Sequence, residues 1–131
     1  MPQPRYLLDT HILIWSLNDP AKLSPLALDL LKGDRVDTAS SHASLWEMAI
    51  KTGLGKLTLP APLPELVPTL LTDLRGTFLP IRLEHTLAVA DLPRHHGDPF
   101  DRLLIVQALA TGLPVLGRDR RFDDYGVNRE W

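Results

Sequence analysis

The stretch that decides the fold lies at residues 5–11 and reads RYLLDTH. Its apolar run, which ends at Leu8, is typical of a buried central strand, and the apolar residues 11–17 predict a short helix. Asp9 then stands at the carboxyl end of the strand. Because open parallel sheets bind ligands in the crevice beyond the carboxyl ends of their strands, Asp9 is a candidate site residue.

The same order of strand and helix continues along the chain. Helix boundaries are indicated by Pro25 after its cap Ser24, by Pro99 after its cap Asp98, and by glycines at 33, 53, 76 and 112. We expect further strands at 36–39, 78–81 and 114–116, a fifth candidate strand at 127–131, and helices at 25–32, 41–52, 65–75, 84–92 and 99–111. This order predicts an α/β fold, a three-layer sandwich whose central, mainly parallel sheet of four to five strands is covered by helices.

Composition narrows the class of protein. The chain has 131 residues, which fits a single domain over 1–131, and it has no cysteine, which excludes disulfides and thiolate zinc sites. No apolar run approaches the ~18 residues that span a bilayer, so we expect a soluble cytoplasmic protein without a membrane segment. Fourteen basic and sixteen acidic side chains produce no global positive field that would indicate nucleic-acid binding.

Four acids are expected to converge on one crevice. Asp9 and Asp119 each follow a strand directly, and Glu47 and Asp101 come from the first turns of helices near the same sheet edge. Such carboxylates repel each other unless a cation lies among them. Oxygen ligands favour Mg²⁺ or Mn²⁺, which are suited to phosphodiester hydrolysis.

Each of these residues also has a purely structural interpretation. Ser44 and Glu47 match the spacing of a capping box, and Asp98 is the cap of its helix with Asp101 as the metal ligand beside it. Asp119 could be an ordinary loop charge, and the acids at 123 and 124 are expected to be solvated.

The sequence gives weaker evidence for a functional role of the histidines. His95 and His96 form a pair in a polar loop, where a surface position is the more common outcome. His11 and His42 flank the expected crevice and could touch a substrate phosphate.

Three segments together carry a resemblance: residues 7–11 (LLDTH), 44–51 (SLWEMAIK) and 96–104 (HGDPFDRLL). In this order they resemble the PIN-domain ribonucleases, and more narrowly the VapC toxins of bacterial type II toxin–antitoxin systems. The likeness runs from Arg5 to the carboxyl terminus, so a PIN-like fold is expected for the whole of it.

The resemblance implies roles for the acids. Asp9, Glu47, Asp101 and Asp119 would be the catalytic, metal-binding residues, with Asp98 as an accessory acid. It further implies Mg²⁺ or Mn²⁺, cleavage of single-stranded or looped RNA by metal-activated water, a homodimer, and a VapB-like antitoxin whose tail lies across the site. Such proteins commonly carry Thr or Ser two residues before the last acid, whereas this chain has Gly117.

Basic and apolar residues near the acids suggest contact surfaces. Arg94, Arg118 and Arg120 could bring RNA phosphates to an acidic pocket, because guanidinium groups suit bidentate phosphate contact. Candidate antitoxin contacts are Leu13, Trp15 and Trp46.

Other classes of protein fit less well. An aspartyl-phosphate phosphatase also places Asp after the first strand but needs a second acid where this chain has His11, and a receiver domain needs a late lysine, whereas none follows Lys56. Neither glycine-rich nucleotide-binding motif is present. A catalytically inactive RNA-binding domain stays open as an alternative.

Overall fold

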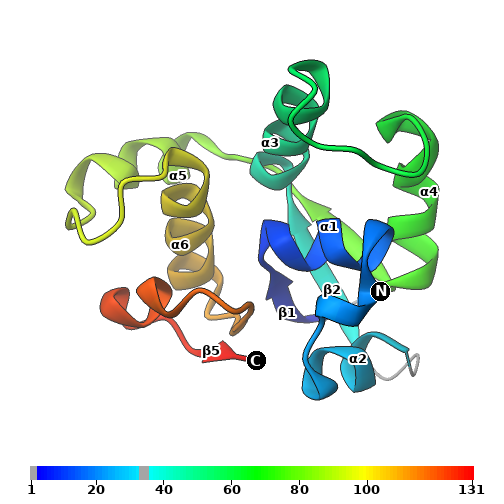
Figure 1. Ribbon diagram of the computed structural model, residues 1–131. Helices are drawn as coiled ribbons and strands as arrows, with labels where there is room; N and C mark the ends of the chain where they lie inside the picture. Colours follow the sequence, from blue (N-terminus) through cyan, green and yellow to red (C-terminus); the bar gives the residue numbers. More distant parts are fainter. Residues whose placement is uncertain (1–2, 33–35) are drawn as a thin grey trace.

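A computed structural model describes residues 3–32 and 36–131 (Figure 1). Its five strands form one parallel sheet in the order β3-β2-β1-β4-β5, which confirms the predicted α/β class. The strands are β1 (Pro4–Leu8), β2 (Asp37–Ser41), β3 (Gly76–Leu79), β4 (Val115–Leu116) and β5 (Arg129–Glu130).

Helices cover both faces of this sheet. Figure 1 shows α5, α6 and η3 on one side of the strands and α1, α2 and α4 on the other. The α-helices are α1 (Thr10–Asn18), α2 (Pro25–Lys32), α3 (His42–Gly53), α4 (Leu63–Asp73), α5 (Leu83–Ala88) and α6 (Pro99–Thr111). Short 3₁₀ helices are η1 (Pro20–Lys22), η2 (Val89–Asp91) and η3 (Arg120–Tyr125). In the described ranges no helix is long and apolar enough to cross a bilayer.

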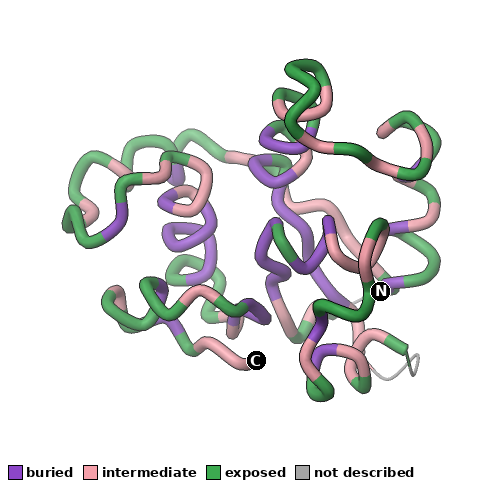
Figure 2. The backbone as a smooth tube through the Cα atoms, viewed as in Figure 1, coloured by how far each residue is buried: buried purple, intermediate pink, exposed green. Residues whose placement is uncertain are grey.

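Two apolar cores follow from the alternation of side chains along β1. Leu8 packs with Ile12 and Met48 in one core, whereas Leu7 packs with Leu104 and Phe122 in the other. Figure 2 shows the buried residues along the central strands and α6, and exposed residues at the outer loops. The three-layer prediction is therefore confirmed.

The strand order places a crevice beside β1. The chain passes from β1 outward to β2 and β3, and then returns to the other side of β1 with β4. Leu8 of β1 pairs with Leu116 of β4, so the residues that follow them, Asp9 and Gly117, meet at the carboxyl edge. A reversal of strand order at this edge is the usual position of a ligand site in open α/β sheets.

The predictions around Gly76 were wrong. The helix expected at 65–75 spans Leu63–Asp73, and Gly76 begins β3 instead of ending that helix. Arg75 makes the turn with a φ of 47°, and a Cβ at position 76 would lie 2.8 Å from the Leu70 carbonyl oxygen. A close backbone approach, not a helix stop, therefore explains this glycine.

Other boundaries also differ from prediction, since the strands expected at 36–39 and 127–131 span Asp37–Ser41 and Arg129–Glu130. The segment 84–92 divides into α5 and η2, and the strand expected at 78–81 ends at Leu79. Gly33, predicted to end α2, lies outside the described residues, whereas Gly112 ends α6 as expected with a φ of 72°.

Candidate metal centre

Asp101 lies at the centre of the acidic cluster. Asp98 caps α6 as predicted, because its Oδ1 accepts hydrogen bonds from the backbone nitrogens of Phe100 (2.8 Å) and Asp101 (3.0 Å). Ligand atoms of Asp101, Glu47 and Asp98 lie within 4.8 Å of one another. A second group with the same spacing combines Asp101 with His96 and Asp119. Asp101 is thus shared by two potential cation sites.

Asp9 approaches the cluster from the end of β1. Its side chain is 2% exposed, and its Oδ1 has no hydrogen-bond partner among the described residues. A Cβ built at Gly117 would lie 2.8 Å from the Cβ of Asp9 and 3.2 Å from its Oδ2. The glycine that replaces the expected Thr or Ser therefore provides the space that this Asp9 conformation occupies.

Charge repulsion is evident at Asp101. Burial, the largest cause, and the neighbouring charges of Asp9, Asp98, Glu47 and Asp119, in that order, together raise its pKa to about 7. When like charges are crowded together without a cation, a carboxyl group among them keeps its proton at neutral pH. The predicted convergence of the acids is therefore seen in the structure.

Asp119 is neutralised by a neighbour. The Arg121 guanidinium donates to both oxygens of Asp119, with Nη2 2.8 Å from Oδ2, and this pairing lowers the pKa of Asp119 to about 2. Asp119 also caps η3, since its Oδ1 accepts from the Arg121 backbone nitrogen at 2.9 Å. It is therefore both a cap and a member of the acidic cluster.

Glu47 is buried and paired, and the capping-box interpretation was wrong. Ser41 caps α3, with its hydroxyl oxygen accepting from the Ala43 nitrogen at 3.0 Å, so Ser44 lies inside the helix. The Ser44 hydroxyl instead accepts from Thr10 Oγ1 at 2.8 Å, which joins the helices that follow β1 and β2. Glu47 accepts from the Lys51 ammonium one turn later and points into the crevice.

His96 is the main residue that the sequence interpretation misplaced. Its side chain is 3% exposed instead of lying at the surface, whereas His95 is exposed as expected. The backbone nitrogen of Asp98 donates to His96 Nδ1 at 3.1 Å, so in the neutral ring Nε2 carries the proton. That Nε2 faces Asp101 Oδ2 at 2.9 Å and Asp119 Oδ2 at 3.4 Å. His96 Nε2 thus lies close to both carboxylates, although it forms no hydrogen bond with either of them.

Arg102 supports the loop that carries His96, a role that sequence reasoning missed. Its guanidinium is buried and donates to the carbonyl oxygens of Val89 (3.1 Å), Leu92 (3.0 Å), Pro93 (2.9 Å) and His96 (3.2 Å). The helical spacing could have indicated this role. Arg102 precedes the buried Ile105 by three residues and the buried Val106 by four, so all three lie on the same face of α6, which faces the protein interior.

The residues of this crevice fit a hard divalent cation. The donor set consists of carboxylate oxygens, and the buried, unpartnered Oδ1 of Asp9 needs an electropositive neighbour. A cation would also offset the repulsion that raises the pKa of Asp101. Asp9, Glu47, Asp101 and Asp119 could hold it, with Asp98 beside them.

The predicted RNA-binding arginines divide into two sets. Arg118 and Arg120 are exposed and border a hollow of about 350 Å³ that is also lined by Asp9 and Asp119. Arg94 is exposed in the loop before α6 and does not line this hollow.

The predicted docking residues also differ from one another. Leu13 is 0% exposed and cannot contact a partner, because it belongs to the core between α1 and the sheet. Trp15 is half-buried, and Trp46 is 55% exposed with its ring edge-on to Phe100 at 5.1 Å.

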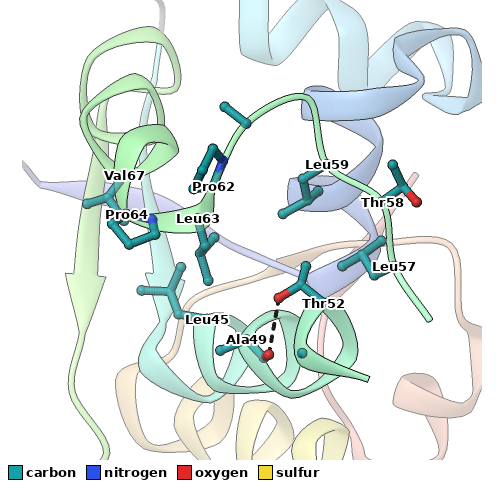
Figure 3. A pocket seen from close by; sticks show the side chains of 12 residues that line it. Leu45, Ala49, Thr52, Leu57, Thr58, Leu59, Pro62, Leu63, Pro64 and Val67 are labelled. Atoms are coloured by element: carbon teal, nitrogen blue, oxygen red, sulfur yellow. Dashed lines mark hydrogen bonds between the residues drawn. The ribbon is translucent and has the colours of Figure 1, made fainter. Parts of the chain in front are cut away.

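A larger apolar groove of about 850 Å³ lies between α3, the loop at 57–62 and the start of α4 (Figure 3). The leucine side chains at its rim come from all three segments, with Leu45 from α3, Leu59 from the loop and Leu63 from α4.

The structure is an α/β domain with a parallel sheet, and acidic groups that could bind a metal ion lie at the switch point of that sheet. Comparison with known families makes this more specific. The sequence matches the PIN domain over residues 6–128, and the chain therefore belongs to the PIN domain family, a class of nucleases. The curated proteins include no match to this sequence.

Several solved structures share the fold. VapBC2 from Rickettsia felis, bound to a promoter DNA fragment, superposes with a TM-score of 0.70 at 18% identity and covers 95% of this chain and 96% of that chain. DNA-bound VapBC from Salmonella typhimurium has a TM-score of 0.67 at 20% identity and covers 98% of both chains. FitAB bound to the IR36 DNA fragment has a TM-score of 0.65 at 19% identity, with coverage of 95% and 93%.

Proposed function

We propose that this chain is a metal-dependent endoribonuclease that acts as the toxin of a toxin–antitoxin pair in the cytoplasm, as one PIN-like domain. The observation that carries the proposal is the cluster of Asp101, Glu47 and Asp98, whose carboxylate oxygens lie within 4.8 Å of one another. Membership of the PIN family and the likeness to VapBC and FitAB structures support it.

The acids divide the work at this centre. We assign the cation to Asp9, Asp101, Glu47 and Asp119, of which Asp9 lies outside both groups of closely spaced ligand atoms. Asp98 would contribute charge while it caps α6. When bound, Mg²⁺ or Mn²⁺ would supply an activated water and offset the charge of the phosphodiester. The chain's own contribution is a crevice in which the carboxylates are fixed before substrate arrives.

His96 positions two of these acids. Its Nε2–H faces the Oδ2 atoms of Asp101 and Asp119 and offsets part of their repulsion. The same nitrogen cannot also be a ligand while Nδ1 accepts from the Asp98 backbone, because a neutral imidazole has only one free lone pair.

Cleavage of total cellular RNA by the purified full-length chain tests the function. We expect cleavage with Mn²⁺, none with EDTA, and none with Asp9→Asn. Asp73→Asn is a matched control, because Asp73 is an exposed acid at the end of α4 and should leave cleavage unchanged. Folded, antitoxin-free protein that leaves RNA intact with every divalent metal would instead support an inactive RNA-binding domain.

We further propose that a VapB-like antitoxin binds across the apolar groove between α3 and α4 and reaches toward Trp46. The groove is lined by aliphatic side chains, and an amphipathic helix is the partner that such a groove accepts. Ala49→Glu should abolish co-purification with the neighbour-encoded antitoxin while RNA cleavage persists. Retained co-purification would place the antitoxin elsewhere.

A homodimer belongs to the same proposal. Leu83 and Leu87 of α5 and Leu109 of α6 are large exposed apolar residues at 73%, 62% and 48%, and they form the candidate face for a second copy. Light scattering should show a dimer that Leu83→Asp converts to a monomer.

A further inference from the structure

A second hollow, of about 610 Å³, lies next to the metal centre and is lined by Arg118, Arg120, Arg129 and Trp131. It shares Arg118 and Arg120 with the hollow that contains Asp9 and Asp119. A ligand that extends out of the acidic crevice past these arginines therefore enters the second hollow directly.

The charges in this second hollow are not all neutralised. Arg129 is paired, because it donates to Asp123 at 2.9 and 3.0 Å and to the Gly117 carbonyl oxygen at 3.2 Å. By contrast, the guanidinium groups of Arg118 and Arg120 make no hydrogen bond or ion pair with any residue in the described part of the chain. Arg120 only contributes, after Arg129, to the lowered pKa of Asp123. Two exposed guanidinium groups remain available for an anion, and their planar forks match the oxygens of a phosphate.

Aromatic rings continue from the acids to this hollow. His11 packs on Trp15 with ring centroids 5.4 Å apart, and Trp15 packs on Trp131 at 6.0 Å. Trp131 is half-buried, so part of its ring stays open on the side of the arginines. Indole faces bind unpaired bases by stacking, whereas the bases of a duplex are already stacked on each other.

We propose that Arg118, Arg120 and Trp131 form a nucleotide subsite that holds the phosphate and the base next to the scissile phosphodiester of an unpaired RNA strand. The proposal rests on the ribonuclease function above and adds to it a binding site for the neighbouring nucleotide. We expect such a subsite to have free guanidinium groups, an open indole and continuity with the acidic crevice. An acidic peptide would bind the guanidinium groups but has no base to stack on the aromatic surface.

Binding in EDTA tests the subsite without cleavage. Fluorescence anisotropy with a short labelled oligouridylate, measured over a range of salt concentrations, gives the affinity and the salt slope for the full-length chain. The double variant Arg118→Ala/Arg120→Ala should reduce that slope by about 1.4, because each phosphate contact to a single strand contributes about 0.7. Arg5→Ala is the matched control, since Arg5 is exposed near the amino end of β1, at the opposite edge of the sheet.

Replacing Trp131 should change the binding of the oligonucleotide in a different way from replacing the arginines. Trp131→Ala should weaken binding about 5-fold or more without a change in salt slope, and Trp131→Phe should restore most of the affinity because a ring remains for stacking. Circular dichroism of each variant establishes that it is folded. The same strand annealed to its complement should bind more weakly than the single strand.

Separate outcomes distinguish the two proposals. Metal-dependent cleavage by the unaltered chain, with an unchanged salt slope in the double arginine variant, would overturn the subsite and leave the ribonuclease intact. The expected slopes without cleavage under any metal would support the subsite and remove the nuclease. Equal competition by oligoglutamate of the same charge, together with no effect of Trp131→Ala, would overturn the assignment to a nucleotide.

Discussion

Replacing Arg102 with methionine should destabilise the protein by about 3–5 kcal/mol, a large share of the roughly 5–15 kcal/mol that stabilises a typical domain. The guanidinium donates to four backbone carbonyl oxygens between residues 89 and 96 at 2.9–3.2 Å. A charged hydrogen bond contributes about 1.5–3 kcal/mol, and a carbonyl left buried without a donor costs about 1–3 kcal/mol. These terms are not additive, because the loop can relax and admit water.

Urea denaturation measures this loss. Met keeps the apolar stem of the side chain, so the difference reports on the guanidinium and not on packing. The stability of Arg102→Lys should lie between those of the unaltered chain and Arg102→Met, since an ammonium group cannot reach all of these carbonyl oxygens at once. Arg94→Met, an exposed change in the same loop, should stay within about 0.5 kcal/mol. A loss below about 1 kcal/mol for Arg102→Met would refute the conclusion that this side chain organises the loop.

The metal-free protein should lose stability as pH rises from about 4 to 7, because folded Asp101, with its pKa raised to about 7, keeps a proton that the unfolded chain has released. Urea melts in EDTA across this range test it, and a slope that persists in Asp101→Asn would contradict the assignment. Asp9→Asn should raise metal-free stability by on the order of 1 kcal/mol, since it removes the largest of the neighbouring charges acting on Asp101, and it should abolish the increase in Tm caused by Mn²⁺. An unchanged metal response would exclude Asp9 as a ligand. Gly117→Ala should cost about 1–3 kcal/mol and reduce cleavage, because its Cβ would lie 2.8 Å from the Cβ of Asp9. Gly53→Ala has no atom within 4 Å and should be neutral or stabilising; similar losses in both variants would rule out a specific effect on Asp9.

Local chemistry allowed the clearest elements to be predicted from sequence. Helix α6 was predicted from its cap Asp98, its first residue Pro99 and its stop Gly112, and each of these has the expected role. Asp9 was predicted at the site because a parallel strand ends directly before it. In these cases the deciding interactions join residues within a few positions of each other.

Long-range contacts explain what the sequence interpretation missed. Ser44 has the spacing of a cap, but its hydroxyl is bound by Thr10, 34 residues away. Gly76 resembles a helix stop, but it is required by the approach of the Leu70 carbonyl. His96 has a polar loop sequence, yet Arg102 and Tyr125 bind its backbone, and its buried ring lies edge-on to Phe122. Such contacts depend on tertiary packing and leave no periodic signal.

Most acids of the metal centre have a cationic or N–H partner within the chain. Lys51 pairs with Glu47, Arg121 with Asp119, and the His96 N–H faces Asp101. Lys51 and Arg121 would compete with an incoming cation, because each already occupies carboxylate oxygens.

Asp9 differs from these acids. Its Oδ1 is buried without a hydrogen-bond partner among the described residues, and the exposed His11 ring lies 3.8 Å from its Oδ2. Its charge also contributes most, among the neighbouring acids, to the raised pKa of Asp101. A divalent cation therefore gains most between Asp9 and Asp101, where neither Lys51 nor Arg121 has to be displaced and the repulsion between the two carboxylates is relieved. We expect this pair to bind first, with Glu47 and Asp119 completing the site as Lys51 and Arg121 yield.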